Sequence, residues 1–124
     1  MSVKNILIVE DDLNLNRVFT KYLSGQGYQV ESVHSCAEAT DLLAGGNAPD
    51  VVIVDFELSD GNSVPFLRML EQPDYKGVKV IVCSGKAYSP QYGINVARVN
   101  QFLLKPVSPR ELTLLVNVLA PASK

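Results

Sequence analysis

Cysteine and long apolar runs are scarce in this sequence. It has two cysteines, Cys36 and Cys83, in 124 residues, and isolated thiols of this kind usually stay reduced inside cells. No apolar run approaches the length that spans a bilayer, and the N-terminus lacks the charged, apolar and small-residue order of a secretion signal. We therefore expect a cytoplasmic protein with no disulfide and no membrane contact.

An excess of basic charge is also missing. Lys and Arg number 11 against 13 Asp and Glu, for a net charge of -2, and no dense Lys/Arg stripe occurs. The electrostatic footprint of direct nucleic-acid binding is therefore absent, and a protein or small-molecule partner is expected. The length, with 47% hydrophobic and 19% charged residues, is typical of one soluble globular domain. We assign residues 1–120 to this domain and residues 121–124 to a tail or the start of a linker.

Short apolar runs alternate with amphipathic stretches of helical period. This alternation indicates βαβ units and predicts an α/β fold around a parallel sheet. The nearly all-apolar runs suit strands that are buried on both faces. The predicted strands occupy residues 5–9, 28–33, 51–54, 78–83 and 101–104.

Helix signals lie between and after these runs. The first predicted helix carries its apolar residues within 15–23, Ser35 caps the second, and the third begins near Ser63. Ser108 opens the last helix as part of a capping box with proline at the first helical position. Between residues 85 and 100, proline and glycine interrupt the pattern, so a short or distorted helix is expected there.

Polar residues follow four of the predicted strands. In an open parallel sheet, ligands bind outside the carboxyl ends of the strands, so these polar residues should meet at one edge. They are Glu10, Asp11 and Asp12 after the first strand, Asp55 after the third, Ser84 after the fourth and Lys105 after the fifth.

These residue types predict metal-assisted phosphoryl chemistry. Carboxylates that converge on a small volume repel one another unless a cation neutralises them, and oxygen ligands suit Mg2+ or Mn2+. Asp55 is then free to attack phosphorus and form an aspartyl phosphate, while Lys105 stabilises the phosphoryl oxygens and Ser84 donates its hydroxyl. Taken singly, each residue is also compatible with a turn, a helix cap or an ordinary loop. The prediction therefore depends on their joint position.

Four motifs at the predicted strands stand out: Ile-Leu-Ile-Val-Glu-Asp-Asp at 6–12, Val-Val-Ile-Val-Asp-Phe-Glu-Leu-Ser-Asp-Gly at 51–61, Val-Ile-Val-Cys-Ser-Gly at 80–85 and Phe-Leu-Leu-Lys-Pro at 102–106. They resemble the receiver domains of bacterial two-component response regulators, and the resemblance covers nearly the whole chain. It implies a flavodoxin-like three-layer α/β/α sandwich with a five-stranded parallel sheet in the order 2-1-3-4-5, flanked by five helices.

The resemblance also implies a function and a set of partners. A receiver domain is a phosphoacceptor in phosphorelay signal transduction that promotes its own phosphorylation and dephosphorylation, and it is not a conventional turnover enzyme. The implied donor is phosphohistidine on a sensor histidine kinase or a histidine phosphotransfer protein. The implied target is a downstream effector domain or protein, and a phosphorylation-dependent dimer is compatible with this interpretation.

Roles for individual residues follow from the same resemblance. Asp55 matches the phosphoacceptor, and the Lys105–Pro106 peptide bond is expected to be cis. The metal ligands would be Glu10, Asp11, Asp55 and the backbone carbonyl of Glu57, with Asp12 as a neighbouring carboxylate. The remaining matches are Lys105 as the phosphate-contacting lysine, Ser84 as the switch hydroxyl and Phe102 as the aromatic that changes rotamer.

Three features are particular to this chain. Ser63 stands where the family commonly has glycine, and Arg98 stands where it commonly has a small residue, so the loop after Asp55 and the coupling to output are expected to differ. Glu57 and Lys86 each lie two residues past a site residue. We hypothesise that their side chains pair across the mouth of the site and hinder an attacking water, against the alternative of two solvated surface charges.

Two other interpretations stay open. A receiver-like interaction module could bind partners without phosphorylation, although Glu10, Asp11, Asp55, Ser84 and Lys105 are all present. A haloacid-dehalogenase-like phosphatase also places a nucleophilic Asp at a strand end with an acidic residue two positions later. Such an enzyme needs Asp at that second position and acidic ligands later in the chain, whereas this acidic cluster lies upstream of Asp55. Flavin binding is disfavoured, because acidic residues after the first strand would repel the phosphate.

Overall fold

The computed structural model describes residues 3–122 and is built on one five-stranded parallel sheet. Its strand order is β2-β1-β3-β6-β7, which confirms the predicted order 2-1-3-4-5 of the large sheet. The predicted strands are confirmed, with end points that differ by at most one residue. The strands are β1 (Asn5–Val9), β2 (Gln29–Val33), β3 (Val51–Asp55), β6 (Lys79–Ser84) and β7 (Gln101–Leu104).

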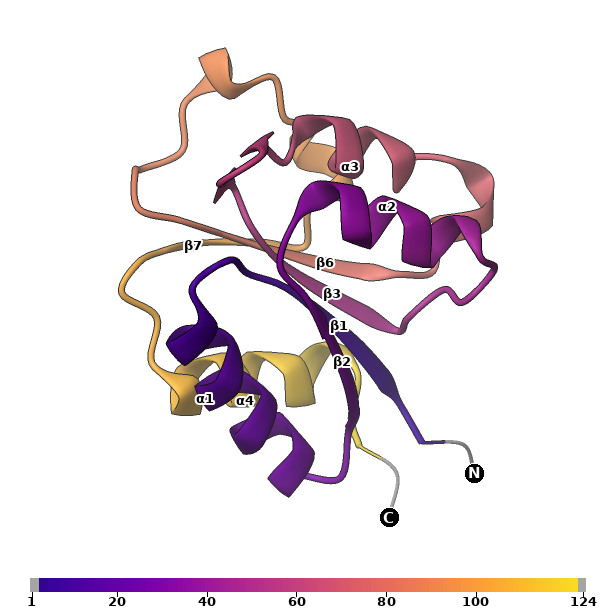
Figure 1. Ribbon diagram of the computed structural model, residues 1–124, viewed down its shortest axis with the longest axis vertical. Helices are drawn as coiled ribbons and strands as arrows, with labels where there is room; N and C mark the ends of the chain where they lie inside the picture. The colour runs from indigo at the N-terminus through magenta and orange to yellow at the C-terminus, as the bar shows by residue number, and fades with distance from the viewer. Residues whose placement is uncertain (1–2, 123–124) are drawn as a thin grey trace.

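Helices cover both faces of this sheet (Figure 1). Helices α1 (Leu13–Gly25) and α4 (Pro109–Leu119) lie on one face, and α2 (Cys36–Ala44) and α3 (Val64–Met69) lie on the other. The three layers are those of the flavodoxin-like sandwich that the resemblance implied. Residues 121 and 122 follow the last helix, while residues 123 and 124 of the predicted tail lie outside the described residues.

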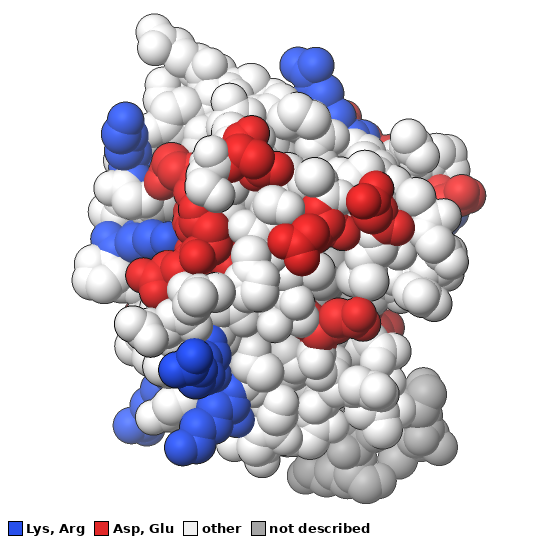
Figure 2. All heavy atoms as spheres, viewed as in Figure 1, with Lys and Arg blue, Asp and Glu red and all other residues white. Residues whose placement is uncertain are grey.

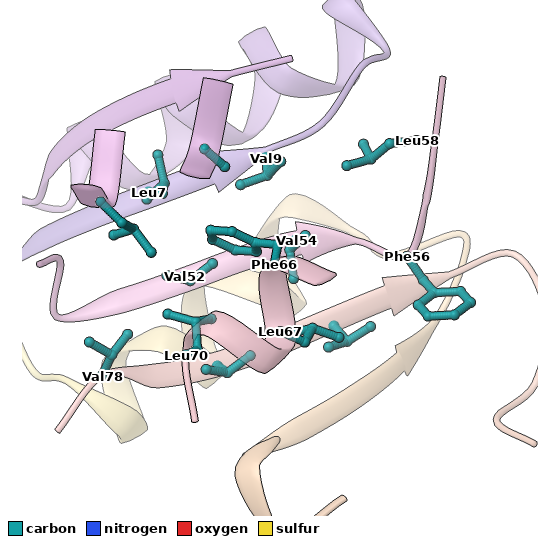
Figure 3. Close-up of a cluster of buried hydrophobic side chains, with 14 of the residues drawn as sticks. Leu7, Val9, Val52, Val54, Phe56, Leu58, Phe66, Leu67, Leu70 and Val78 are labelled. Atoms are coloured by element: carbon teal, nitrogen blue, oxygen red, sulfur yellow. The ribbon is translucent and has the colours of Figure 1, made fainter. Parts of the chain in front are cut away.

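The central strands are hydrophobic because both of their faces are covered. All five residues of β3 are buried, and its side chains alternate between the two cores. Figure 3 shows Val52 and Val54 of β3 on the same side as Phe66 of α3 and Leu70, the residue after α3, and each of these four side chains is buried. This burial is the dominant stabilising contribution to the fold and holds the strand ends in fixed relative positions.

Side-chain caps fix the helix starts. Asp12 accepts a hydrogen bond from the Leu15 N–H and is the N-cap of α1. Ser35 and Ser108 cap α2 and α4 in the same way, as predicted. Ser63 precedes α3 but makes no side-chain cap. Its hydroxyl donates instead to the backbone carbonyl of Asp55.

A short hairpin follows β3 and was not predicted. Strands β4 (Glu57–Leu58) and β5 (Gly61–Asn62) pair antiparallel, with Gly61 at φ 124°. Few side chains other than glycine adopt that backbone conformation. The two-residue strands are too short for an alternating pattern to be visible in the sequence.

The expectation of five helices is wrong within residues 3–122, which form four α-helices and three short 3-10 helices. The segment after β6 contains only η2 (Pro90–Tyr92) and η3 (Val96–Arg98), while η1 (Pro73–Tyr75) precedes β6. Proline lacks a backbone N–H, and Gly93 adopts a left-handed conformation at φ 76°, so η2 ends after a single turn. The predicted distortion of this region is therefore confirmed, and it extends to the loss of the whole α-helix between β6 and β7.

The side chain of Arg98 holds the irregular segment between β6 and β7 in place. Its guanidinium donates to the backbone carbonyls of Leu70, Tyr75 and Val78 at 2.7, 2.7 and 2.8 Å. Burial lowers the pKa of Arg98, partly offset by the charge of Glu71. These bonds connect η3 to the residue after α3, to η1 and to the residue before β6.

Within the described part of the chain, no helix is both long and apolar enough to span a membrane.

Candidate functional site

The predicted site residues meet at the carboxyl edge of the sheet. Strand β1 leads directly into Glu10, β3 ends at Asp55, β6 ends at Ser84 and β7 leads into Lys105. Parallel pairing places these ends side by side, with Asp55 opposite Cys83 in register and Ser84 opposite Leu104. Figure 2 shows the largest gathering of acidic side chains on the left of the view, the side on which β1 and β3 end in Figure 1.

Lys105 bridges two carboxylates that are far apart in the chain. Its Nζ lies 3.0 Å from Asp55 Oδ2 and 3.2 Å from Glu10 Oε1. Asp55 and Glu10 are buried, whereas Lys105 is partly exposed. The Lys105–Pro106 peptide bond is cis, as the resemblance implied.

Asp11 completes an all-oxygen cluster. Glu10, Asp11 and Asp55 each offer a carboxylate oxygen, and the three oxygens lie within 4.8 Å of one another. Three oxygen donors at this spacing fit a hard divalent cation such as Mg2+, which prefers carboxylates together with waters and phosphate oxygens. The partly exposed Asp11 leaves the cluster open to solvent on one side.

Burial disfavours the charged forms of both buried acids, and the charge of Asp55 adds to this effect for Glu10. Burial, followed by the charge of Asp55, raises the pKa of Glu10 from 4.5 to about 7. Burial also raises the pKa of Asp55, although the hydrogen bond and charge of Lys105 oppose the shift. For Lys105, burial acts to lower the pKa, but the bond to Asp55 and the charges of both acids outweigh it, and the pKa is raised. A cation bound between the acids would favour their charged forms and oppose these shifts.

Ser84 and Glu57 are joined directly. The Ser84 hydroxyl donates to Glu57 Oε2 at 2.6 Å, and the Gly85 N–H donates to Glu57 Oε1 at 2.9 Å. The predicted ion pair between Glu57 and Lys86 is wrong. Among residues 3–122, the ion pairs are the two made by Lys105, and the two Glu57 oxygens accept hydrogen bonds from Ser84 at the end of β6 and from Gly85.

The two remaining candidate residues are placed outside the carboxylate cluster. Asp12 is the α1 cap, which is the structural role that the sequence also allowed. Phe102 on β7 is partly buried and meets Tyr88 edge to face, with ring centroids 5.6 Å apart. Tyr88 also contacts Tyr92, which stacks at 4.8 Å on Phe56, the residue after Asp55. These four aromatic rings form a continuous row from Phe56, the residue after β3, to Phe102.

Sequence reasoning missed two residues that position the site. Asn16 is buried, and its side-chain amide donates to the carbonyls of Glu10 and Val33 at 3.1 and 3.3 Å. Ser63 is fully buried and donates to the Asp55 carbonyl, which fixes the chain beyond β3. A polar residue at an inward position of an amphipathic helix was the available signal for Asn16. No local pattern indicated the contact that Ser63 makes.

Comparisons with known proteins agree with this geometry. Residues 6–117 match the family described as the response regulator receiver domain. The chain is similar to the KDP operon transcriptional regulatory protein KdpE of Escherichia coli, with 33% identity over 109 residues, 87% of this chain and 47% of that protein. It is also similar to the transcriptional regulatory protein CpxR of Escherichia coli, with 26% identity over 110 residues, 89% of this chain and 46% of that protein. The chain thus spans about half the length of the curated relatives it matches.

Solved structures share the fold at low sequence identity. The chemotaxis response regulator CheY4 of Vibrio cholerae has a TM-score of 0.82 and 21% identity, covering 95% of this chain and 99% of that one. A response regulator receiver domain protein of Methanospirillum hungatei has a TM-score of 0.83 and 24% identity, covering 94% and 93%. The sheet order, the carboxyl-edge cluster and the match over residues 6–117 lead to one conclusion: the chain belongs to the response regulator receiver domain family.

Proposed function

We propose that this domain accepts a phosphoryl group on Asp55 and uses the change to switch the binding of a partner. The observation that carries the proposal is the ion-paired cluster, in which Lys105 contacts both Asp55 and Glu10 while Asp11 lies beside them. A buried carboxylate next to a lysine and two further acids is arranged for nucleophilic attack on phosphorus with charge compensation.

The proposed reaction is a transfer from phosphohistidine. An Asp55 oxygen forms a bond to phosphorus, the phosphorus–nitrogen bond of the donor breaks, and the imidazole leaves with the electron pair and takes up a proton. Lys105 stays beside the carboxylate and stabilises negative charge on the phosphoryl oxygens. Ser84, at the end of the neighbouring strand β6, is the proposed hydroxyl donor to the same group.

A divalent cation is part of the proposal. Glu10, Asp11 and Asp55 would hold Mg2+ or Mn2+, together with the backbone carbonyl of Glu57. When bound, the ion supplies positive charge that neutralises the acids and the phosphoryl oxygens. Asn16 holds Glu10 in position, because its side-chain amide donates a hydrogen bond to the backbone carbonyl of Glu10.

The switch would pass through Ser84 and Phe102. In the proposed phosphorylated state, Ser84 turns toward the phosphoryl group and Phe102 changes rotamer. The ring of Phe102 packs against Tyr88, so its movement would disturb the aromatic row that extends to Phe56. The surface formed by residues 86–104 is the proposed output face. It presents short 3-10 helices in this chain.

The proposed partners follow from the family. A sensor histidine kinase or histidine phosphotransfer protein would supply the phosphoryl group, and an effector domain or protein would respond to the switch. The matched curated relatives are named as transcriptional regulators and are about twice as long as this chain, so an effector region elsewhere in a longer protein is one form of the proposal. We assign no direct nucleic-acid binding to the receiver domain itself.

The experiment that tests the proposal is intact-mass measurement after incubation with acetyl phosphate and Mg2+. The wild type should gain the mass of one phosphoryl group, and Asp55→Asn should gain none. Asp41→Asn, an exposed substitution on α2, is the matched control and should label like the wild type. Omitting the divalent ion with EDTA should abolish labelling, because the acidic cluster then stays uncompensated.

Three results would contradict the proposal. Equal labelling of the wild type and Asp55→Asn would place the acceptor elsewhere, and a complete lack of labelling would favour a constitutive interaction module. Catalytic turnover of a phosphomonoester in place of stoichiometric labelling would favour the phosphatase interpretation.

A further inference from the structure

The carboxylate of Glu57 accepts hydrogen bonds from Ser84, the last residue of β6, and from Gly85, the next residue. Ser84 Oγ donates to Glu57 Oε2 at 2.6 Å, and the Gly85 N–H donates to Glu57 Oε1 at 2.9 Å. The Lys86 N–H donates in turn to Ser84 Oγ at 3.1 Å. The hydroxyl of the fully buried Ser84 therefore donates its proton to an exposed carboxylate on the neighbouring hairpin.

The hairpin that carries Glu57 is itself fixed to Asp55. The Glu57 N–H donates to Asp55 Oδ1 at 3.2 Å, and Ser63, just beyond the hairpin, donates through its hydroxyl to the Asp55 carbonyl. Glu57 also pairs with Asn62 across the two short strands. Residue 57 thus lies between the phosphoacceptor and the switch hydroxyl, with one hydrogen bond to the first and one to the second.

A serine hydroxyl has one proton and can donate it to one acceptor at a time. While it donates to Glu57, it is unavailable to a phosphoryl oxygen at Asp55. The bond to Glu57 is short and charge-assisted, which makes it stronger than a bond between neutral groups. A dianionic group on Asp55 would also repel the nearby Glu57 carboxylate, so modification of Asp55 and the Glu57–Ser84 bond oppose each other.

We propose that Glu57 is a positioning residue that restrains Ser84 in the unmodified state, and that phosphorylation at Asp55 requires Ser84 to exchange the Glu57 carboxylate for a phosphoryl oxygen. This inference rests on the proposed function. It assigns to Glu57 a role in setting how readily the switch responds. The same carboxylate also accepts from the Gly85 N–H, so its displacement would free a second donor at the edge of the site.

The test uses beryllofluoride with Mg2+, which mimics a phosphoryl group without a transfer step. Its affinity is measured by fluorine NMR in Glu57→Ala, Ser84→Ala, the double variant and the wild type. Loss of one charge-assisted hydrogen bond of about 1.4 kcal/mol corresponds to about tenfold, so Glu57→Ala should bind the probe about tenfold more tightly. Glu57→Gln, whose amide oxygen is uncharged but can still accept from Ser84, should fall between the wild type and Glu57→Ala.

The double variant separates restraint of Ser84 from simple charge removal. In the Ser84→Ala background, Glu57→Ala should change the affinity by no more than about twofold, because the bond to be exchanged is already absent. Glu31→Gln removes one negative charge from an exposed position on β2 that makes no side-chain hydrogen bond among the described residues, and it should bind like the wild type. Urea unfolding of each variant checks that the domain stays folded.

Three outcomes would overturn the inference. They are an equal effect of Glu57→Ala with and without Ser84, an unchanged affinity, and weaker binding in Glu57→Ala. Failure of the proposed function looks different: the wild type would then neither bind beryllofluoride nor gain mass from acetyl phosphate, and the role of Glu57 would fall with it.

Discussion

The carboxylate cluster should destabilise the metal-free domain at neutral pH, and Glu10→Gln tests this directly. Folding raises the pKa of Glu10 from 4.5 to about 7, mainly through burial and then through the charge of Asp55. Each pKa unit corresponds to about 1.36 kcal/mol, so ionised Glu10 costs the folded state about 3 kcal/mol. Glutamine removes the charge but keeps a side-chain oxygen. That oxygen can still accept the hydrogen bond that the Asp12 N–H donates to Glu10 Oε2 at 3.2 Å in the wild type.

The sign of the pH dependence follows from the direction of this shift. Below pH 4.5, Glu10 is protonated in both states and costs nothing. As pH rises from 4.5 to about 7, the unfolded chain loses the proton first, so the free energy of unfolding falls. Above this window the group is ionised in both states, and the full cost is present.

The assay is urea unfolding in EDTA at a series of pH values. The wild type and Glu10→Gln should have similar stability near pH 4.5, and the variant should be more stable by about 3 kcal/mol at pH 8. For a domain of this length, that difference corresponds to roughly 12 °C in Tm. Glu31→Gln, an exposed charge removal on β2, should follow the wild-type curve.

Two results would refute this reasoning. Parallel pH profiles for the wild type and Glu10→Gln would mean that Glu10 titrates normally in the folded protein. A variant less stable than the wild type at pH 8 would mean that the contact with Lys105 outweighs the cost of burying the charge. Adding Mg2+ at pH 8 should narrow the gap, because the ion stabilises the wild type by binding to the ionised cluster.

Two further predictions concern residues that hold the site in place. Arg98→Met should lower the free energy of unfolding by about 3 kcal/mol, because three backbone carbonyls lose a charged donor. Urea unfolding measures this change. The control, Arg17→Met, removes an exposed arginine on α1 and should change the free energy of unfolding little. Asn16→Leu should cost about 2 kcal/mol and weaken Mg2+ binding, because the carbonyl of Glu10 loses its buried partner. Calorimetry of Mg2+ binding checks the second effect, and Asn14→Leu on the exposed side of the same helix is its control. Unchanged stability in Arg98→Met, or equal Mg2+ affinity in the two Asn variants, would contradict these roles.

The periodic features of the chain were readable from the sequence. The apolar runs of β1, β3 and β6 follow from burial on both faces, which leaves little choice of residue type along a strand. The location of Asp55 beside other polar residues also has a general cause, because parallel strands bring their carboxyl ends to one edge of the sheet. The sequence therefore predicts that Glu10, Asp55 and Lys105 meet, and the distances between them confirm it.

The irregular segments were less predictable, because their conformation depends on contacts with distant parts of the chain. The segment of residues 85–100 reads only as a poor helix, while its actual path depends on Arg98 binding carbonyls of residues 70, 75 and 78. The hairpin after Asp55 has strands of two residues, too short to carry a periodic signal.

The sequence alone determined the α/β class, the strands of the large sheet and the set of acids gathered at one edge, because burial patterns and strand direction are properties of the chain itself. The strand order followed from the resemblance of the motifs to a known family. Only the tertiary structure decided which partner each polar side chain takes. Glu57 was expected to face Lys86, yet it binds Ser84 and Gly85. Several acceptors lie within reach of one hydroxyl or carboxylate, and the choice depends on distances of a few tenths of an ångström that residue spacing does not specify.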